Sequence, residues 1–332
     1  MRRVLVSAVL LVAAVPATAR ADGLPAVGID AHPLGLPEGD VAYITRAGAH
    51  STRLIEHARY GGPLRERRLR GSFSIPAVAY DGSPSGLTPD GRKLVLISPR
   101  TRFPRRHTTF AVVDTRALAV RRRIALRGDF SFDAISPDGR TMYLIEYPSG
   151  DVLDYAVRAY DLGARRLVRR PIVDPDEPAE EMRGIPVTRI ADLDGRWAYT
   201  LYSNGKHSFV HALDTTERTA VCIDLPVRRE WGARLELHGT RLDVVGQRSQ
   251  MLASVDTRTH ALTPSPPESP AGEDASTAAS EDAGTSWLPL AAPTALLLLL
   301  AAATRRRLVK KPAPEPITEV WEPPSDRHAP TA

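Results

Sequence analysis

Short apolar stretches with a two-residue period recur between residues 24 and 262, and the clearest of them follow a polar turn. The stretches 93–97, 141–145 and 197–201 each come directly after an Asp-Gly-Arg sequence. An alternating pattern predicts β-strands whose successive side chains point to opposite faces of a sheet. No run in this region has the 3.6-residue period of a helix, so the pattern predicts an all-β domain.

The turn and the strand after it form a phrase that occurs five times. The clearest copies are 88–97, 136–145 and 192–201, and weaker copies are 37–43 and 237–244. The glycines that align in these copies are Gly39, Gly91, Gly139, Gly195 and Gly239, at intervals of 52, 48, 56 and 44 residues. A second phrase follows each of the last four copies and contains Asp114, Asp161, Asp214 or Asp256. Two phrases that keep the same spacing indicate a structural repeat of about fifty residues.

Each repeat contains the signals for one small antiparallel sheet. In the Pro-Asp-Gly turn, proline fixes φ at the second position and glycine takes the left-handed conformation that closes a bulged hairpin. A second strand ends at the aspartate of the second phrase, and a polar turn opens a third strand, such as 123–126. One such sheet cannot bury both of its faces, so we expect the repeats to pack side by side as the blades of a β-propeller. The stretch 24–262 has room for about five blades.

These phrases resemble those of the bacterial β-propellers with Ser-Pro-Asp-Gly repeats, the TolB-like, YVTN-type and WD40-like group. The resemblance covers residues 24–262, and what it implies is a propeller fold without a particular activity. The segment 185–215 is also similar to actinobacterial surface proteins, and this similarity implies no activity either.

Two apolar segments outside the repeats predict a cellular address. Residues 1–21 have the form of a secretory signal peptide, with two arginines, an apolar run and a small-residue cleavage site. Residues 287–304 are long enough for one transmembrane helix, and the basic residues that follow predict a cytoplasmic C-terminus. We therefore expect a single-pass protein of the cell membrane whose domain 22–262 is extracytoplasmic. The second segment also resembles a Gram-positive wall sorting signal but lacks its threonine-glycine pair, which favours a retained anchor.

The segments on either side of the predicted transmembrane helix lack the composition of a folded domain. Residues 263–286 are rich in Pro, Ser, Thr and Ala, carry five carboxylates and contain no basic residue. Such a stretch cannot bury enough apolar surface to fold, so it predicts a disordered stalk. Residues 305–332 are basic and then proline-rich, and predict a disordered cytoplasmic tail.

The positive charge of the chain is almost entirely arginine. The formal net charge is +5, and Lys93 and Lys206 are the only lysines before residue 310. Arginine-rich stretches contain Arg67, Arg68, Arg121 and Arg122. We expect these stretches to fall around turns, where they could gather into a patch for an anionic partner; separate solvated strand edges are the alternative. No recognition helix or base-stacking motif accompanies them, so we expect no nucleic-acid partner.

The sequence contains no motif that indicates catalysis or a bound cofactor. Zinc-peptidase, paired-cysteine and phosphate-loop motifs are absent, and a single cysteine forms no internal disulfide. His207 and His211 have the spacing of metal ligands on a helix, but on a strand they would lie about 13 Å apart. We therefore predict no catalytic residue, no metal site and no cofactor.

Together these features favour a binding or scaffold module displayed at the cell surface, with a protein or an anionic cell-envelope polymer as its partner. Two other functions remain open. A lactonase-like or hydrolytic enzyme would require three or more acidic or histidine side chains that meet at the propeller channel. A surface receptor would require an ordered or modified tail.

Overall fold

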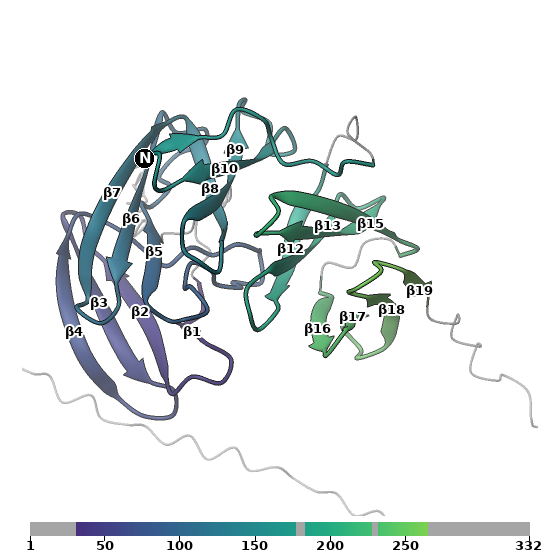
Figure 1. Ribbon diagram of the computed structural model, residues 1–332, viewed down its shortest axis with the longest axis horizontal. Coiled ribbons are helices and arrows are strands. Elements are labelled where there is room, and N and C mark those ends of the chain that lie inside the picture. The colour runs from purple at the N-terminus through teal and green to yellow at the C-terminus, as the bar shows by residue number, and fades with distance from the viewer. Residues whose placement is uncertain (1–30, 177–182, 228–231, 265–332) are drawn as a thin grey trace, which may run out of the picture. The chain divides into compact units, whose positions relative to one another are not determined.

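The computed structural model describes residues 31–176, 183–227 and 232–264 (Figure 1). The predicted signal peptide 1–21, the transmembrane segment 287–304, the tail 305–332 and nearly all of the stalk lie outside these residues. Every regular element in the described part is a β-strand, which confirms the all-β prediction. The same residues contain no helix that is long and apolar enough to cross a bilayer.

The described strands form five antiparallel sheets, and in each sheet neighbours along the chain are hydrogen-bonded neighbours. Sheet 1 contains β1 (Leu34–Gly35), β2 (Val41–Ala47), β3 (Ser51–Ala58) and β4 (Pro63–Arg70). Sheet 2 contains β5 (Lys93–Ile97), β6 (His107–Asp114) and β7 (Ala119–Arg127). Sheet 3 contains β8 (Asp129–Ile135), β9 (Thr141–Tyr147), β10 (Ala156–Asp161) and β11 (Arg166–Leu167).

The last two sheets complete the described part of the chain. Sheet 4 contains β12 (Ile185–Ala191), β13 (Trp197–Ser203), β14 (Ser208–Asp214) and β15 (Thr219–Leu225). Sheet 5 contains β16 (Arg234–His238), β17 (Arg241–Val245), β18 (Met251–Asp256) and β19 (Leu262–Pro264). The final strand therefore extends two residues past the domain end predicted at residue 262.

The aligned glycines sit in turns, and four of the five adopt the left-handed conformation. The φ angles of Gly91, Gly139 and Gly195 are 67°, 63° and 72°, and each N–H donates to the carbonyl three residues earlier. Gly239 has φ of 61° in the hairpin between β16 and β17. Gly39 also donates to the carbonyl three residues earlier, at 3.0 Å, but without a left-handed φ. The turn prediction is therefore correct for the three clear copies.

The second phrase folds back onto the first. The Thr115 hydroxyl donates to the Gly91 carbonyl at 2.6 Å, and the Thr215 hydroxyl donates to the Gly195 carbonyl at 2.8 Å. The aspartate before each threonine accepts N–H groups of the next turn, as Asp214 does from residues 216 and 217. The fourth residue after each of the four aspartates has a left-handed φ: Leu118, Arg165, Arg218 and His260. In these repeats the second phrase therefore hydrogen-bonds to the turn of the first.

Buried apolar clusters join each sheet to the next along the chain. The clusters contain Leu54 and Leu94 for sheets 1 and 2, Phe110 and Phe132 for sheets 2 and 3, Tyr143 and Leu213 for sheets 3 and 4, and Leu201 and Leu242 for sheets 4 and 5. Burial of one such side chain stabilises the fold by about 1.5–3 kcal/mol. Successive meanders of three or four strands that pack through their faces define a β-propeller fold.

Candidate anion-binding site

The four arginines that the sequence marks as anion-binding candidates lie on two edge strands. Arg67 and Arg68 are in β4, the last strand of sheet 1, and Arg121 and Arg122 are in β7, the last strand of sheet 2. The expectation that they fall around turns is therefore wrong. Charged side chains suit an outer strand because they keep its unpaired edge from joining the sheet of another chain.

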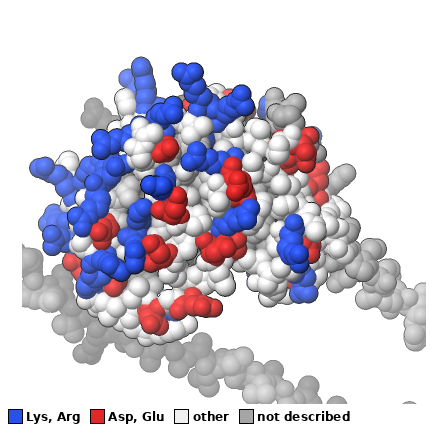
Figure 2. All heavy atoms as spheres, viewed as in Figure 1, with Lys and Arg blue, Asp and Glu red and all other residues white. Residues whose placement is uncertain are grey.

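The two edge strands carry eight arginines and one glutamate and touch each other. The Arg123 side chain donates to the Arg70 carbonyl, and Arg65 Nη1 donates to the Arg116 carbonyl at 2.7 Å. Figure 2 shows Lys and Arg side chains crowded on the side of the molecule where Figure 1 places β4 and β7. We call the following residues the arginine rim: Arg65, Arg67, Arg68, Arg70, Arg121, Arg122, Arg123 and Arg127.

Carboxylates neutralise only part of the rim. Arg65 forms an ion pair with Glu56, and Arg121 forms one with Asp114 at 2.9 Å. The one glutamate of the two strands, Glu66, pairs with Arg53 of β3 rather than with the rim. The exposed Arg68 donates to a serine hydroxyl, at 3.0 Å. The rim therefore keeps a clear excess of positive charge in contact with solvent.

A groove of about 290 Å³ lies beside the rim, between sheets 2 and 3. Sheet 2 contributes Lys93, Arg121 and Arg122, and sheet 3 contributes Arg140 from its Pro-Asp-Gly turn. The remaining lining residues are Val112, Gly139, Leu162 and Gly163. Among the residues that the structure describes, no carboxylate lines this space, which we call the basic groove.

Backbone oxygens hold two of these cations in place. Lys93 Nζ donates to the carbonyls of Asp138 at 3.2 Å and Gly139 at 2.9 Å. The Arg122 side chain donates to the Leu162 carbonyl. Gly139 leaves room for this lysine, because a Cβ there would lie 2.6 Å from Lys93 Nζ and would displace the side chain. The close approach fixes the lysine against the neighbouring sheet.

Aspartates next to the basic groove reduce its charge, and Asp114 and Asp138 are two of them. Asp114 pairs with Arg121, and backbone N–H groups and that arginine lower its pKa. Burial raises the pKa of Asp138, but hydrogen bonds from Ser136 and the Arg140 backbone, with the Arg140 and Lys93 charges, lower it further than burial raises it. Both carboxylates are thus ionised at neutral pH. The groove therefore combines four lining cations with carboxylates that lie beside it but not in its lining.

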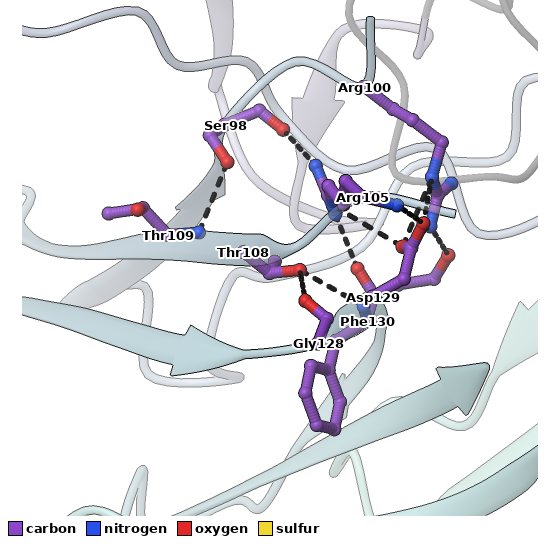
Figure 3. Close-up of polar contacts among 9 residues, drawn as sticks. Ser98, Arg100, Arg105, Thr108, Thr109, Gly128, Asp129 and Phe130 are labelled. Carbon is purple, nitrogen blue, oxygen red and sulfur yellow. Dashed lines mark hydrogen bonds and ion pairs between the residues drawn. The ribbon is translucent and has the colours of Figure 1, made fainter. Parts of the chain in front are cut away.

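A buried polar cluster also anchors the loop after β5, and the sequence did not predict it. Arg100 and Arg105 both contact Asp129 at the start of β8, and all three side chains are almost fully buried (Figure 3). Arg105 also donates to the Ser98 carbonyl at 2.8 Å and to the Phe130 carbonyl. The sequence carries one signal for this cluster. Asp129, Ser131 and Asp133 alternate with apolar residues in β8, and polar side chains in a strand that is buried throughout need polar partners.

A second cavity, of about 270 Å³, lies among strands β1, β8 and β12 and the loop before β5. Its lining is mainly apolar, and its charged side chains are Arg189 and Asp192. Arg189 forms a buried ion pair with Asp133 of β8. The guanidinium is therefore already neutralised, which leaves Asp192 as the unusual group of this cavity.

Asp192 begins the third turn phrase, at the position that Thr88 and Ser136 occupy in the first two. Burial raises the pKa of Asp192 to about 7; the Trp197 N–H lowers it, and Asp194 raises it again. The hydroxyl of Thr88 or Ser136 donates to the aspartate two residues later, at 2.6 Å in both copies. Only a protonated Asp192 could donate the corresponding bond.

The histidines with metal-like spacing do not form a site together. His207 pairs with Asp224 at 2.9 Å, whereas His211 is buried in β14 and burial lowers its pKa to about 4. Within residues 31–176, 183–227 and 232–264, no group of three or more His, Cys, Asp or Glu side chains is placed to hold a metal ion.

Comparison with known proteins finds only solved structures of low similarity. No protein-family model matches the sequence, and no curated protein matches it. TolB from Acinetobacter baumannii is 16% identical, over 70% of this chain and 54% of its own length, with a TM-score of 0.42. The β-propeller domain of Cps50 (Swd1) from Myceliophteria thermophila is 13% identical, over 70% and 68%, with a TM-score of 0.44.

A putative 6-phosphogluconolactonase from Bacteroides uniformis is 15% identical, over 72% of this chain and 71% of its own, with a TM-score of 0.42. The chain spans about half the length of the TolB protein. At this similarity no activity or partner transfers. The class of the protein, a β-propeller, follows from its own sheets and turns.

Proposed function

We propose that this protein is a surface binding module whose five sheets are the blades of one propeller, and that it binds an anionic cell-envelope polymer. The observation that carries the proposal is the arginine rim, in which two touching edge strands hold eight arginines and one glutamate. A strand of eight residues is about 27 Å long, so its charges are too far apart for one small anion. A flexible polymer with a charge on every repeat unit can follow the strands and contact several arginines at once.

The proposed address comes from the sequence. The signal-peptide pattern of 1–21 and the apolar segment 287–304, with basic residues after it, support a single-pass protein whose propeller is extracytoplasmic. The predicted stalk 263–286 is acidic, so it would be repelled by the same polymer. That repulsion would leave the propeller free to reach its partner.

The test measures retention of the purified full chain, in neutral detergent, on immobilised poly(glycerol phosphate) across a salt series. A variant with Arg67→Ser and Arg68→Ser is expected to bind at least about tenfold more weakly, with a slope of log affinity against log salt that is smaller by about two. The matched control is Arg248→Ser, an exposed arginine in the turn before β18. That change should leave retention unchanged.

Two results would overturn the proposal. The first is equal retention of the rim variant and the unchanged protein, or retention that does not respond to salt, since exposed charges are screened beyond about 8 Å at physiological ionic strength. The second is stronger binding to phosphatidylglycerol vesicles than to the polymer, which would assign the rim to a membrane surface.

A further inference from the structure

The basic groove differs from the β4 part of the arginine rim. Its four cations come from two sheets and converge on one space. Lys93 extends from β5, Arg121 and Arg122 from β7, and Arg140 from the turn before β9. The rim arginines of β4 lie along a single exposed strand. A converging set of donors recognises one compact group, whereas a row of donors recognises a line of charges.

Two donors of the groove, Lys93 and Arg122, are held in position and have further N–H groups with which to bind a ligand. Lys93 Nζ makes two hydrogen bonds to carbonyls, and an ammonium has three N–H groups. The Arg122 contact to the Leu162 carbonyl uses one of the five N–H groups of a guanidinium. The contacts are with neutral oxygens, so they orient these two side chains without cancelling their charges.

Charge and shape then select the ligand chemistry. Four cations and no carboxylate line the groove, so it favours an anion of high charge, and a phosphate monoester carries about −1.5 to −2 at neutral pH. A phosphate group offers three acceptor oxygens in different directions, and arginine binds phosphate through two parallel hydrogen bonds. A single carboxylate offers two oxygens in one plane and one charge, which would leave part of this set unneutralised.

The size of the groove agrees with a phosphate group that carries a substituent. A volume of about 290 Å³ equals roughly ten water molecules at about 30 Å³ each. A simple ion would leave most of this space to solvent. Val112 and Leu162 supply apolar surface for the carbon atoms of a substituent.

We propose that the basic groove is a specific site for a phosphate group, either a terminal phosphomonoester or two successive phosphodiesters of a polymer. This inference deepens the proposed function, because it gives the propeller a preference for phosphate polymers over other polyanions. In it, the Arg121, Arg122 and Arg140 guanidiniums and the Lys93 ammonium donate to the phosphate oxygens.

The first experiment compares two polymers that carry similar charge, poly(glycerol phosphate) and poly(glutamate), on the full chain. Arg140→Gln is expected to weaken binding of the phosphate polymer at least fivefold and binding of poly(glutamate) less than twofold. Arg92→Gln is the matched control, because Arg92 holds the same turn position in sheet 2, is exposed and does not line the groove. The rim variant with Arg67→Ser and Arg68→Ser should weaken both polymers alike.

The second experiment separates the two sources of phosphate and does not depend on the polymer. Glycerol 3-phosphate is titrated into the full chain by calorimetry, with glycerol and acetate as controls. Saturable binding that is lost in Arg140→Gln and kept in the rim variant supports a phosphomonoester site. Binding of the polymer alone, still sensitive to Arg140→Gln, supports successive phosphodiesters.

The inference fails if the polymers are retained and Arg140→Gln weakens both equally or weakens neither. The proposed function could survive that result, because the rim would still bind polyanions without discrimination. Conversely, glycerol 3-phosphate binding without any polymer retention would remove the proposed function and keep the groove. The two conclusions are therefore separable.

Discussion

Asp192 is expected to make the fold less stable as the pH rises to neutrality. In the first two turn copies, the hydroxyl of Thr88 or Ser136 donates to the aspartate two residues later and accepts the N–H five residues later. In the third copy, Asp192 accepts the Trp197 N–H at 3.0 Å. Its neighbour Asp194 makes an ionised Asp192 unfavourable, because two carboxylates in one turn repel each other.

The magnitude follows from the shift in pKa. Burial, with the charge of Asp194 as a further cause, raises the pKa of Asp192 from 3.8 to about 7. A carboxyl whose pKa is raised in the folded state favours folding below its unfolded pKa, and this advantage is lost as the pH rises from about 4 to about 7. About three pKa units would correspond to about 4 kcal/mol. Because the carboxyl is only half-buried, solvent screens its interactions, and we expect about 1–2 kcal/mol.

The perturbation is Asp192→Ser, which gives the third turn the hydroxyl that Ser136 supplies in the second. Urea unfolding of the full chain, followed by tryptophan fluorescence, is measured between pH 4.5 and 7.5. The variant should be more stable than the unchanged protein by about 1–2 kcal/mol at pH 7.5, and the difference should nearly vanish at pH 4.5. Thr88→Ser, which keeps a hydroxyl at the equivalent position, should show no such pH dependence.

Either of two results would refute this reasoning. A stability difference that stays constant with pH would show that Asp192 has the same pKa in the folded and unfolded chain. A serine variant less stable than the unchanged protein at pH 7.5 would show that the carboxylate makes a favourable contact there, which outweighs its repulsion with Asp194.

Two further substitutions test the packing of the fold. Gly139→Val should destabilise the protein by about 1–3 kcal/mol, since it strains a left-handed turn and collides with Lys93; an unchanged urea midpoint would contradict this. Asp129→Asn should cost about 3–5 kcal/mol, because it removes the charge that neutralises the buried Arg100 and Arg105. A thermal unfolding midpoint within a degree or two of the unchanged protein would show that these arginines are neutralised elsewhere.

The turns could be predicted from the sequence because their signals are local. Proline, aspartate and glycine act within four residues, and the alternation after them specifies the next strand. The repeat spacing then gave the number of sheets that the structure describes. The contact of the Thr115 hydroxyl with the Gly91 carbonyl could not be predicted in this way, although both residues belong to the repeated phrases, because it depends on how the two strands pair.

The candidate site was only half predictable. Composition pointed to Arg121 and Arg122, but nothing local showed that they lie in a strand beside Lys93 and Arg140 of other elements. A run of arginines looks the same in a turn and in an edge strand, because both are exposed. The partner of an edge strand is set by packing between sheets, over distances in sequence that no local pattern records.

The turn glycines show which parts of the repeat can change in length and which cannot. A Cβ would lie 2.6 Å from Lys93 at Gly139 and 2.5 Å from Pro89 at Gly195, and at Gly91 it would make ordinary contact with Leu36, so these turns lie close to other copies of the phrase or to the residue before one. Yet the intervals between the glycines range from 44 to 56 residues. The repeated unit can therefore gain or lose residues in its distant loops while the turns keep their left-handed glycine. Those loops are the natural places to graft new sequence onto this scaffold.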